Sequence, residues 1–280
     1  GITFDTGGIS IKPAPEMDFQ IDSKIALISG STAGIGFAIA TELAREGARV
    51  VINGRSQKSV DAAVARLRSL VADAKVSGYA ADLSTAYGCQ TLFAACPQAD
   101  ILVNNLGIFD PKPFDAIPDS EWQRFFDINV MSGVRLARHY LPAMKAANWG
   151  RIVFISSESG INTPGEMVHY GMTKSAQLAV SRGLAQSCAG TGVTVNAVLP
   201  GPTRSEGVAE FFGKLAAESG ISLDEMERQF FAQGRPTSIL KRMIEPAEVA
   251  ALVAYVCSGR AAATTGAALR VEGGIVSTIC

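Results

Sequence analysis

The 280-residue sequence predicts an α/β fold: a doubly wound parallel sheet of seven strands with helices on both faces, in a single domain. Two observations support this prediction. From residue 24 onward, short apolar runs alternate with helical stretches, which is the pattern of βαβ units. The runs are almost continuously apolar rather than alternating, as expected of strands that are buried on both faces.

The expected strands follow one another without a linker rich in Pro or Ser between them. They occupy residues 24–29 (KIALIS), 48–53 (ARVVIN), 75–80 (KVSGYA), 100–105 (DILVNN), 151–156 (RIVFIS), 193–198 (VTVNAV) and 267–271 (AALRV). Residues 202–244 break this rhythm, because they separate the sixth strand from the last long helix by far more than a turn. A loop of that length without structure is improbable in a compact domain, so we expect a small helical lid over a pocket.

Composition and charge exclude several classes of protein. A formal net charge of −1 creates no long-range field toward nucleic acid or an anionic membrane. No uncharged run reaches the roughly 18 residues of a membrane span, and no secretion signal is recognisable. The 5 cysteines are scattered and lack C-x-x-C spacing, which favours idle thiols in a reducing compartment. We therefore expect a cytoplasmic protein without nucleic-acid or membrane partners.

The first expected strand runs directly into a glycine-rich turn, SGSTAGIG, which opens a helix. Gly30, Gly34 and Gly36 let the backbone turn tightly and approach a pyrophosphate, while the helix N-terminus offers free N–H groups to that anion. For three glycines alone, a plain glycine-rich turn is the alternative. The position of this turn at the first strand-to-helix junction favours dinucleotide binding.

The end of the second expected strand indicates which dinucleotide binds. An acidic residue there would bond the two free ribose hydroxyls and repel a 2′-phosphate. The sequence instead reads VINGRS, with Gly54 at that place and Arg55 after it. Because a guanidinium holds a phosphate through two hydrogen bonds, we expect NADP(H) rather than NAD(H), with a merely solvated Arg55 as the alternative. Asp82, after the third strand, could accept a hydrogen bond from the adenine amino group or cap the next helix.

Candidate catalytic residues surround the motif HYGMTK at 169–174. Tyr170 and Lys174 are four residues apart and share one face of a helix. A nearby ammonium, together with a positive nicotinamide ring, favours the phenolate and lowers the pKa of a tyrosine toward neutrality. Ser157 ends the fifth strand, at the sheet edge where ligands bind in open α/β folds. Asn129 is a poor helix former in the middle of an expected helix, which suggests a local function.

Residues 24–280 resemble the short-chain dehydrogenase/reductase superfamily in its single-domain branch and are similar to its 3-oxoacyl-ACP reductases. The marks of the family occur in order along the chain: SGSTAGIG, Asp82, NNLG at 104–107, Asn129, Ser157, YGMTK, Pro200-Gly201 with Thr203, and VEGG at 271–274. The resemblance implies a Rossmann-type fold and hydride transfer between a nicotinamide and a carbonyl or alcohol carbon. It also implies a homotetramer formed through the long helices 118–147 and 167–190.

The resemblance further implies a role for each matching residue. Tyr170 would donate the proton to the carbonyl oxygen, Ser157 would hydrogen-bond that oxygen, and Lys174 would bind the nicotinamide ribose and tune the tyrosine. Asn129 would keep a water in a proton relay behind Lys174. No metal site is expected. The residues that would contact the cofactor are Gly30, Ser31, Thr32, Gly34, Ile35, Gly36, Arg55, Asp82, Leu83, Asn105, Gly107, Tyr170, Lys174, Pro200, Gly201 and Thr203.

The substrate is less well indicated than the cofactor. We expect NADP(H)-dependent reduction of a ketone, such as a β-ketoacyl thioester or a cyclic ketone. An NAD(H)-linked alcohol dehydrogenase and a non-catalytic dinucleotide sensor are the alternatives. The pairs Phe211-Phe212 and Phe230-Phe231 either contact a bulky apolar substrate or pack the lid against the domain. Glu158, directly after Ser157, is expected to be exposed to solvent.

The opening stretch, GITFDTGGISIKP, resembles a segment of leucyl aminopeptidases. The upstream lysine and the later acidic motif of that family are missing, and Asp5 alone cannot build a two-metal site. We therefore expect residues 1–16 to be a foreign leader or tag. Residues 17–280 are expected to form the dinucleotide-binding domain, with its lid at 202–244.

Overall fold

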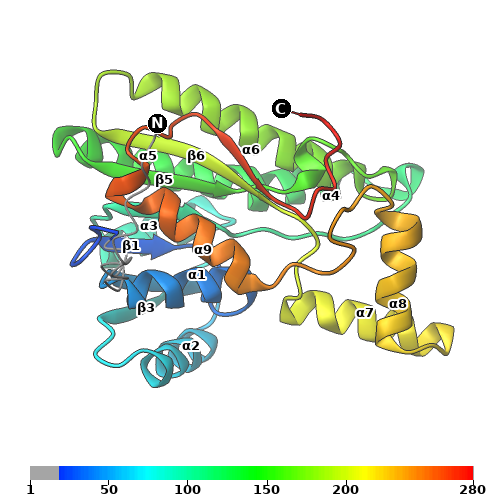
Figure 1. The fold of residues 1–280 in the computed structure, drawn as a ribbon. Helices are drawn as coiled ribbons and strands as arrows, with labels where there is room; N and C mark the ends of the chain where they lie inside the picture. Colours follow the sequence, from blue (N-terminus) through cyan, green and yellow to red (C-terminus); the bar gives the residue numbers. More distant parts are fainter. Residues whose placement is uncertain (1–18, 280) are drawn as a thin grey trace, which may run out of the picture.

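The computed structural model describes residues 19–279, so the expected leader at 1–16 lies outside the described residues. A seven-stranded parallel sheet forms the centre, with the strand order β3-β2-β1-β4-β5-β6-β7. Because the strands are parallel, their carboxyl ends lie at one edge of the sheet (Figure 1). The strands are β1 (Ile25–Ile28), β2 (Arg49–Gly54), β3 (Val76–Ala80), β4 (Ile101–Asn104), β5 (Gly150–Ile155), β6 (Val193–Pro200) and β7 (Ala268–Val271).

Helices cover both faces of the sheet, as Figure 1 shows. One apolar cluster packs α1, α2 and α9 on one face, and a second cluster packs α3, α5 and α6 on the other. Within residues 19–279 the α-helices are α1 (Gly34–Arg45), α2 (Gln57–Leu70), α3 (Ala86–Ala95), α4 (Asp119–Phe126), α5 (Ser132–Ala146), α6 (Val168–Ser187), α7 (Glu206–Ser219), α8 (Leu223–Gln229) and α9 (Pro246–Cys257).

The predicted fold class is confirmed. Each of the seven strands begins and ends within two residues of the position expected from the sequence. The central strands β1, β4, β5 and β6 are buried along nearly their whole length, which is why their sequences are continuously apolar. The edge strand β7 is partly exposed.

The segment between β6 and α9 is helical, as expected for 202–244. Ser205 and Ser222 cap the first turns of α7 and α8, each accepting a hydrogen bond from a backbone N–H. The two helices project from the carboxyl edge of the sheet (Figure 1). A parallel bridge between Thr203 and Ile244 joins the two ends of the segment. Its own small apolar core contains Phe212, Phe231 and Met243.

The long helix expected at 118–147 is interrupted by a π-helical turn, Asp127–Met131, between α4 and α5. Asn129 lies in this turn and is buried. Such turns widen the helix by one residue and redirect the side chains within it, and they are common at functional sites. Asn129, which is unfavourable in a helix interior, therefore lies where the helical backbone is in fact irregular.

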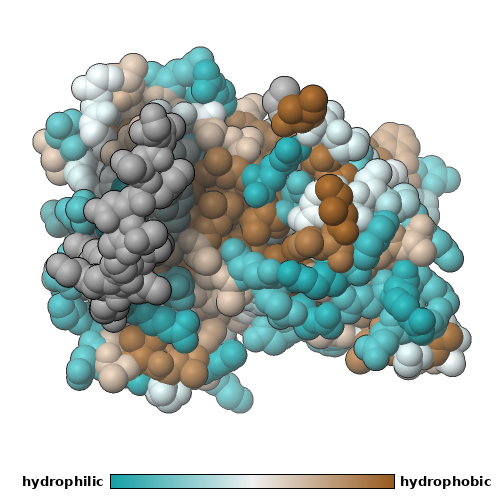
Figure 2. Space-filling model, in the orientation of Figure 1, coloured by the Kyte–Doolittle hydropathy of each residue, from teal (hydrophilic) through white to brown (hydrophobic). Residues whose placement is uncertain are grey.

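The surface drawn in Figure 2 is largely polar, with apolar groups concentrated in a few places. One of them lies beside the carboxyl end of the chain, where Ile279 is 98% exposed. Ile239 and Leu240, in the loop before α9, are also exposed. Within the described part of the chain, no helix combines the length and apolar character required to cross a membrane.

Candidate active site

A pocket of about 610 Å³ lies at the carboxyl ends of the central strands, beside α7. Its lining includes the predicted catalytic residues Ser157, Tyr170 and Lys174, but not Asn129. Of the predicted cofactor residues it contains Gly34, Ile35, Gly36, Asn105, Gly107, Tyr170, Lys174, Pro200, Gly201 and Thr203. Those outside the lining are Gly30, Ser31, Thr32, Arg55, Asp82 and Leu83.

The glycine turn adopts a conformation that only glycine accepts readily. Gly30 and Gly34 have φ values of +60° and +56°, in the left-handed region. A Cβ on Gly36 would lie 2.4 Å from Asn105 Nδ2 and 2.6 Å from the Gly30 carbonyl oxygen. Asn105 Nδ2 in turn donates to the carbonyl oxygens of Ser29 (3.0 Å) and Gly30 (2.9 Å). The turn is thereby held tightly against the end of β4.

The N-terminus of α1 faces the pocket and already meets a carboxylate. Glu206, the first residue of α7, accepts a hydrogen bond from the Gly34 N–H at 2.8 Å. Partial burial alone would raise the pKa of Glu206, but hydrogen bonds from its own N–H, from Gly34 and from Arg66, together with the charge of Arg66, lower that pKa. The helix end therefore stabilises a negative charge at the place where the sequence predicted a pyrophosphate.

The end of β2 has no space for a side chain at position 54. A Cβ on Gly54 would lie 2.5 Å from Thr32 Cγ2 and 3.2 Å from Val60 Cγ2. An aspartate or glutamate at this position would therefore collide with the glycine turn and with α2. Arg55 follows with an exposed side chain, and Ser56 caps α2.

Asp82 does not cap a helix, so that alternative is wrong. Its Oδ1 accepts hydrogen bonds from the Ser84 N–H (3.1 Å) and the Ser84 hydroxyl (2.7 Å), which closes a local turn. Thr85 is the residue that caps α3. Leu83 is buried in the apolar cluster on that face of the sheet.

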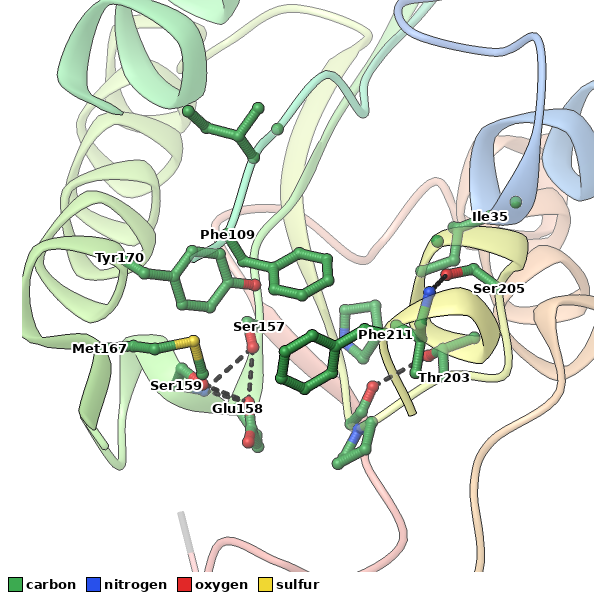
Figure 3. Close-up of a pocket in the computed structure, with 18 of the residues that line it drawn as sticks. Ile35, Phe109, Ser157, Glu158, Ser159, Met167, Tyr170, Thr203, Ser205 and Phe211 are labelled. Atoms are coloured by element: carbon green, nitrogen blue, oxygen red, sulfur yellow. Dashed lines mark hydrogen bonds between the residues drawn. The ribbon is translucent and has the colours of Figure 1, made fainter. Parts of the chain in front are cut away.

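Two neighbouring serines at the end of β5 have different partners. Ser156 is buried and donates to the Lys174 carbonyl oxygen at 2.8 Å, so it packs against the inside of α6. Ser157 lies in the pocket, and the Tyr170 hydroxyl points toward it (Figure 3). Ser156 lines the pocket as well, but its hydroxyl is bonded to α6, so Ser157 is the serine that faces the Tyr170 hydroxyl.

Burial raises the pKa of Tyr170; its hydrogen bond with Ser157 and the charge of Arg235 offset this in part, while Glu158 adds to it. The sequence argument expected a pKa near neutrality from Lys174 and a positive nicotinamide ring together. Without the cofactor, the surroundings of Tyr170 have the opposite effect, because burial raises its pKa by more than Ser157 and Arg235 lower it. These surroundings hold the phenol in its protonated form.

Lys174 is 4% exposed and donates to the Ile155 carbonyl oxygen at 2.9 Å and to Gln177 Oε1 at 3.2 Å. Burial lowers its pKa to about 7, although the charge of Glu158 raises it. Gln177 was not identified from the sequence. Its position three residues after Lys174, on the same helical face, was the available signal.

The backbone of Asn129 takes part in the same hydrogen-bond network. Its carbonyl oxygen accepts from Gln177 Nε2 at 2.6 Å, so Gln177 bridges Asn129 and Lys174. The Asn129 side chain pairs with the backbone of Ile108 in both directions and donates to Thr173. Asn129 is therefore linked to Lys174 through the Gln177 side chain.

The expectation that Glu158 is exposed is wrong. Glu158 is 3% exposed, and its Oε1 accepts from Arg235 Nε at 3.0 Å. Its Oε2 accepts from the hydroxyls of Ser157 and Ser159 (Figure 3). Arg235 follows the π-helical turn Phe230–Gly234, 77 positions away in the chain, so no local pattern signals this pair.

The remaining pocket wall is apolar and partly aromatic. Phe109 packs edge-on against Tyr170 and Phe211, with centroid separations of 6.5 Å in both cases. Phe211 faces Ser157 across the pocket (Figure 3), and Phe212 and Phe230 also line it. Among residues 19–279, no three His, Cys, Asp or Glu side chains are grouped as a metal site requires.

Comparison with known proteins gives a consistent picture. The family described as enoyl-(acyl carrier protein) reductase matches residues 30–276. The chain is 47% identical over 263 residues to the uncharacterized oxidoreductase YvaG of Bacillus subtilis, covering 94% of this chain and 100% of YvaG. It is 31% identical over 262 residues to D-beta-hydroxybutyrate dehydrogenase of Cupriavidus necator, covering 92% and 100%.

A solved structure shows the same fold. L-sorbose reductase from Gluconobacter frateurii, complexed with NADPH and L-sorbose, matches with a TM-score of 0.87 at 30% identity, covering 94% of this chain and 100% of that one. None of the comparisons supports the resemblance of residues 1–16 to a leucyl aminopeptidase.

The buried lysine leads to a prediction about stability and pH. Between the folded pKa of about 7 and the usual value of 10.5, the unfolded chain binds a proton that the folded chain does not. The free energy of unfolding should therefore rise with pH across this window. We expect urea titrations at several pH values to show this rise in the wild type and a clearly smaller one in Lys174→Met. Replacement of the exposed Lys58 should leave the slope unchanged; equal slopes for all three proteins would contradict the assignment.

Proposed function

The chain belongs to the short-chain dehydrogenase/reductase superfamily, and from this premise we propose that it reduces a ketone with NADPH, using Tyr170 as the proton donor. Membership makes it an NAD(P)-dependent oxidoreductase that acts on CH–OH groups and their carbonyl counterparts. The observation that carries the proposal is that Ser157, Tyr170, Lys174 and the glycine turn all line one pocket.

The proposed roles follow from the contacts of each side chain. When bound, the nicotinamide supplies the hydride that reaches the carbonyl carbon. Tyr170 then donates its phenolic proton to the carbonyl oxygen, a transfer that requires the protonated phenol its surroundings maintain. Lys174, fixed by Ile155 and Gln177, faces the same pocket and would hold the nicotinamide ribose.

Support for NADP(H) over NAD(H) comes from two neighbouring positions. The lack of space at Gly54 prevents the acidic side chain that would select NAD(H). The exposed guanidinium of Arg55 is free to fold onto a 2′-phosphate. The similar structure of L-sorbose reductase contains NADPH, which is consistent with this choice.

An NAD(H)-linked alcohol dehydrogenase is the second candidate, and one observation favours it. Ser157 donates its only proton to Glu158, so toward a substrate its oxygen acts as an acceptor. An alcohol O–H could donate to such an oxygen, whereas a carbonyl could not. The relative from Cupriavidus necator is named as a dehydrogenase of a hydroxy acid.

Assembly and the 202–244 segment complete the proposal. A homotetramer is supported by large apolar side chains that are exposed in the carboxyl-terminal part of the chain, among them Tyr255 on α9 and Ile279. The helices α7 and α8 would act as a lid over the substrate, because Phe211, Phe212 and Phe230 line the pocket. A cytoplasmic location rests on the sequence argument alone.

Removing the proposed acid tests the mechanism directly. Tyr170→Phe should lower turnover of uncharged ketones by about 10²- to 10⁴-fold, because the general acid is lost. NADPH affinity, measured by fluorescence titration, should stay within about twofold of the wild type, since the change removes one hydroxyl outside the phosphate sites. Tyr87→Phe, at an exposed position on α3, is the control and should be fully active. Full activity of Tyr170→Phe would exclude the proposed role.

Cofactor preference depends on Arg55. The wild type should bind NADPH more tightly than NADH, and Arg55→Ala should weaken NADPH binding by about tenfold without affecting NADH, since one charge-assisted contact is lost. Fluorescence titration with both dinucleotides measures this. Arg45→Ala removes an exposed charge at the far end of α1 and should change neither affinity. Tighter binding of NADH by the wild type would favour the dehydrogenase alternative instead.

Glu206 provides a test of the pyrophosphate position. Its carboxylate occupies the Gly34 N–H and would repel a phosphate there. Glu206→Gln should therefore bind NADPH several-fold more tightly, as expected when one like-charge contact that is well screened by solvent is removed (about 1 kcal/mol for charges about 4 Å apart in bulk water). Glu210→Gln, one turn further along α7 and paired with Lys214, is the matched control. Unchanged affinity in Glu206→Gln would place the pyrophosphate elsewhere.

A further inference from the structure

The ion pair between Glu158 and Arg235 is the least expected feature of the pocket. Both residues line the pocket, and they are only 3% and 8% exposed. Glu158 belongs to the loop after β5 that also carries Ser157, while Arg235 ends the second π-helical turn behind α8. The pair therefore connects the catalytic edge of the sheet to the 202–244 segment.

Stability alone is a poor reason for such a pair. The desolvation of two buried charges largely cancels their attraction, and well-packed apolar residues of similar size are often as stable. Apolar residues in place of the pair would suit the surrounding walls, which include Phe109, Met167 and Phe230. The presence of charge at this point suggests that it acts on what enters the pocket.

The positive charge of Arg235 is already more than compensated by carboxylates of the chain. Its Nε donates to Glu158 at 3.0 Å, and its Nη1 donates to Glu166 at 3.2 Å and to the Gly234 carbonyl oxygen at 2.7 Å. One guanidinium thus faces two carboxylates. The other basic side chain in the described lining, Lys174, donates to a backbone carbonyl and to Gln177.

An anionic substrate would meet unfavourable conditions here. A carboxylate beside the reacting carbonyl would have to displace Glu158 or Glu166 from Arg235, or lie unpaired against them in an apolar pocket. Either alternative is costly, because an uncompensated buried charge is strongly unfavourable. An uncharged substrate meets no such penalty and packs against the aromatic wall.

We propose that Glu158, by pairing with Arg235 next to Ser157, restricts the pocket to substrates that carry no negative charge beside the reacting carbonyl. This inference rests on the proposed function and adds the substrate class to it. The class is uncharged ketones, including ketoesters and thioesters, as opposed to keto acids. Glu158 acts on specificity through Arg235, so its removal should create affinity for anions in addition to any loss of activity.

The test uses two probes that differ in charge and by one methyl group, acetoacetate and its methyl ester, with the full chain saturated with NADP⁺. Calorimetry should show that Glu158→Gln binds acetoacetate about tenfold or more tightly than the wild type does, because Arg235 has lost one counter-charge. Affinity for the ester should change little. If Glu158→Gln does not gain affinity for acetoacetate, whether both proteins bind it or neither does, the proposal is overturned.

Two controls separate this effect from a general change of charge or fold. Glu210→Gln makes the same charge change on the exposed face of α7, outside the pocket, and should gain nothing. The double variant Glu158→Gln, Arg235→Gln should lose the gain, since the cation itself is removed. Thermal melting of each protein checks that it is folded.

A second measurement on the wild type alone decides the matter should Glu158→Gln fail to fold. The kcat/KM for methyl acetoacetate should exceed that for acetoacetate by about tenfold or more, and equal values would overturn the proposal. Failure of the proposed function would appear differently, as absent NADPH binding or as unchanged turnover in Tyr170→Phe. The charge preference can therefore fail while the reductase assignment stands.

Discussion

The structure depends on how closely the glycine turn approaches the end of β4. Gly36 has no space for a Cβ against Asn105, and Asn105 holds the carbonyl oxygens of Ser29 and Gly30. This contact sets the direction in which α1 leaves the sheet, and α1 is the helix against which α9 packs. It also directs the N-terminus of α1 toward the pocket, so one backbone constraint contributes to the core packing and to the proposed pyrophosphate site.

A second principle is the burial of charge around the proposed catalytic residues. Lys174 is held by a carbonyl oxygen and by Gln177, and Gln177 leads to the backbone of Asn129 in the π-helical turn. On the other side, Glu158 links Ser157 to Arg235. Lys174 and Glu158 are therefore each fixed by at least one partner from a different element, Ile155 in β5 and Arg235 respectively. Such sites sacrifice stability for a defined arrangement of charge, as functional sites commonly do.

The sequence predicted those features that depend on local pattern. Buried parallel strands are continuously apolar, so their positions could be read to within two residues. Tyr170 and Lys174 share a helical face by spacing alone, and Ser157 follows a strand end. Glu158 was misjudged because its partner lies 77 positions away, and Glu206 was not identified because its contact with Gly34 spans 172 positions. Pairings of that range depend on the packing of whole elements, which no local pattern records.

The surroundings of Tyr170 bear on the direction of the reaction. Burial and Glu158 favour the neutral phenol, while Ser157 and Arg235 favour the phenolate without prevailing. A residue that must donate a proton needs its protonated form, so these surroundings suit the proton-donating role that we propose for Tyr170 in reduction. Oxidation would need the phenolate, and hence the positive charge of an oxidised nicotinamide beside it. In the proposed mechanism the same side chain would therefore serve both directions, with the positive charge needed for oxidation supplied by the oxidised cofactor rather than by the protein.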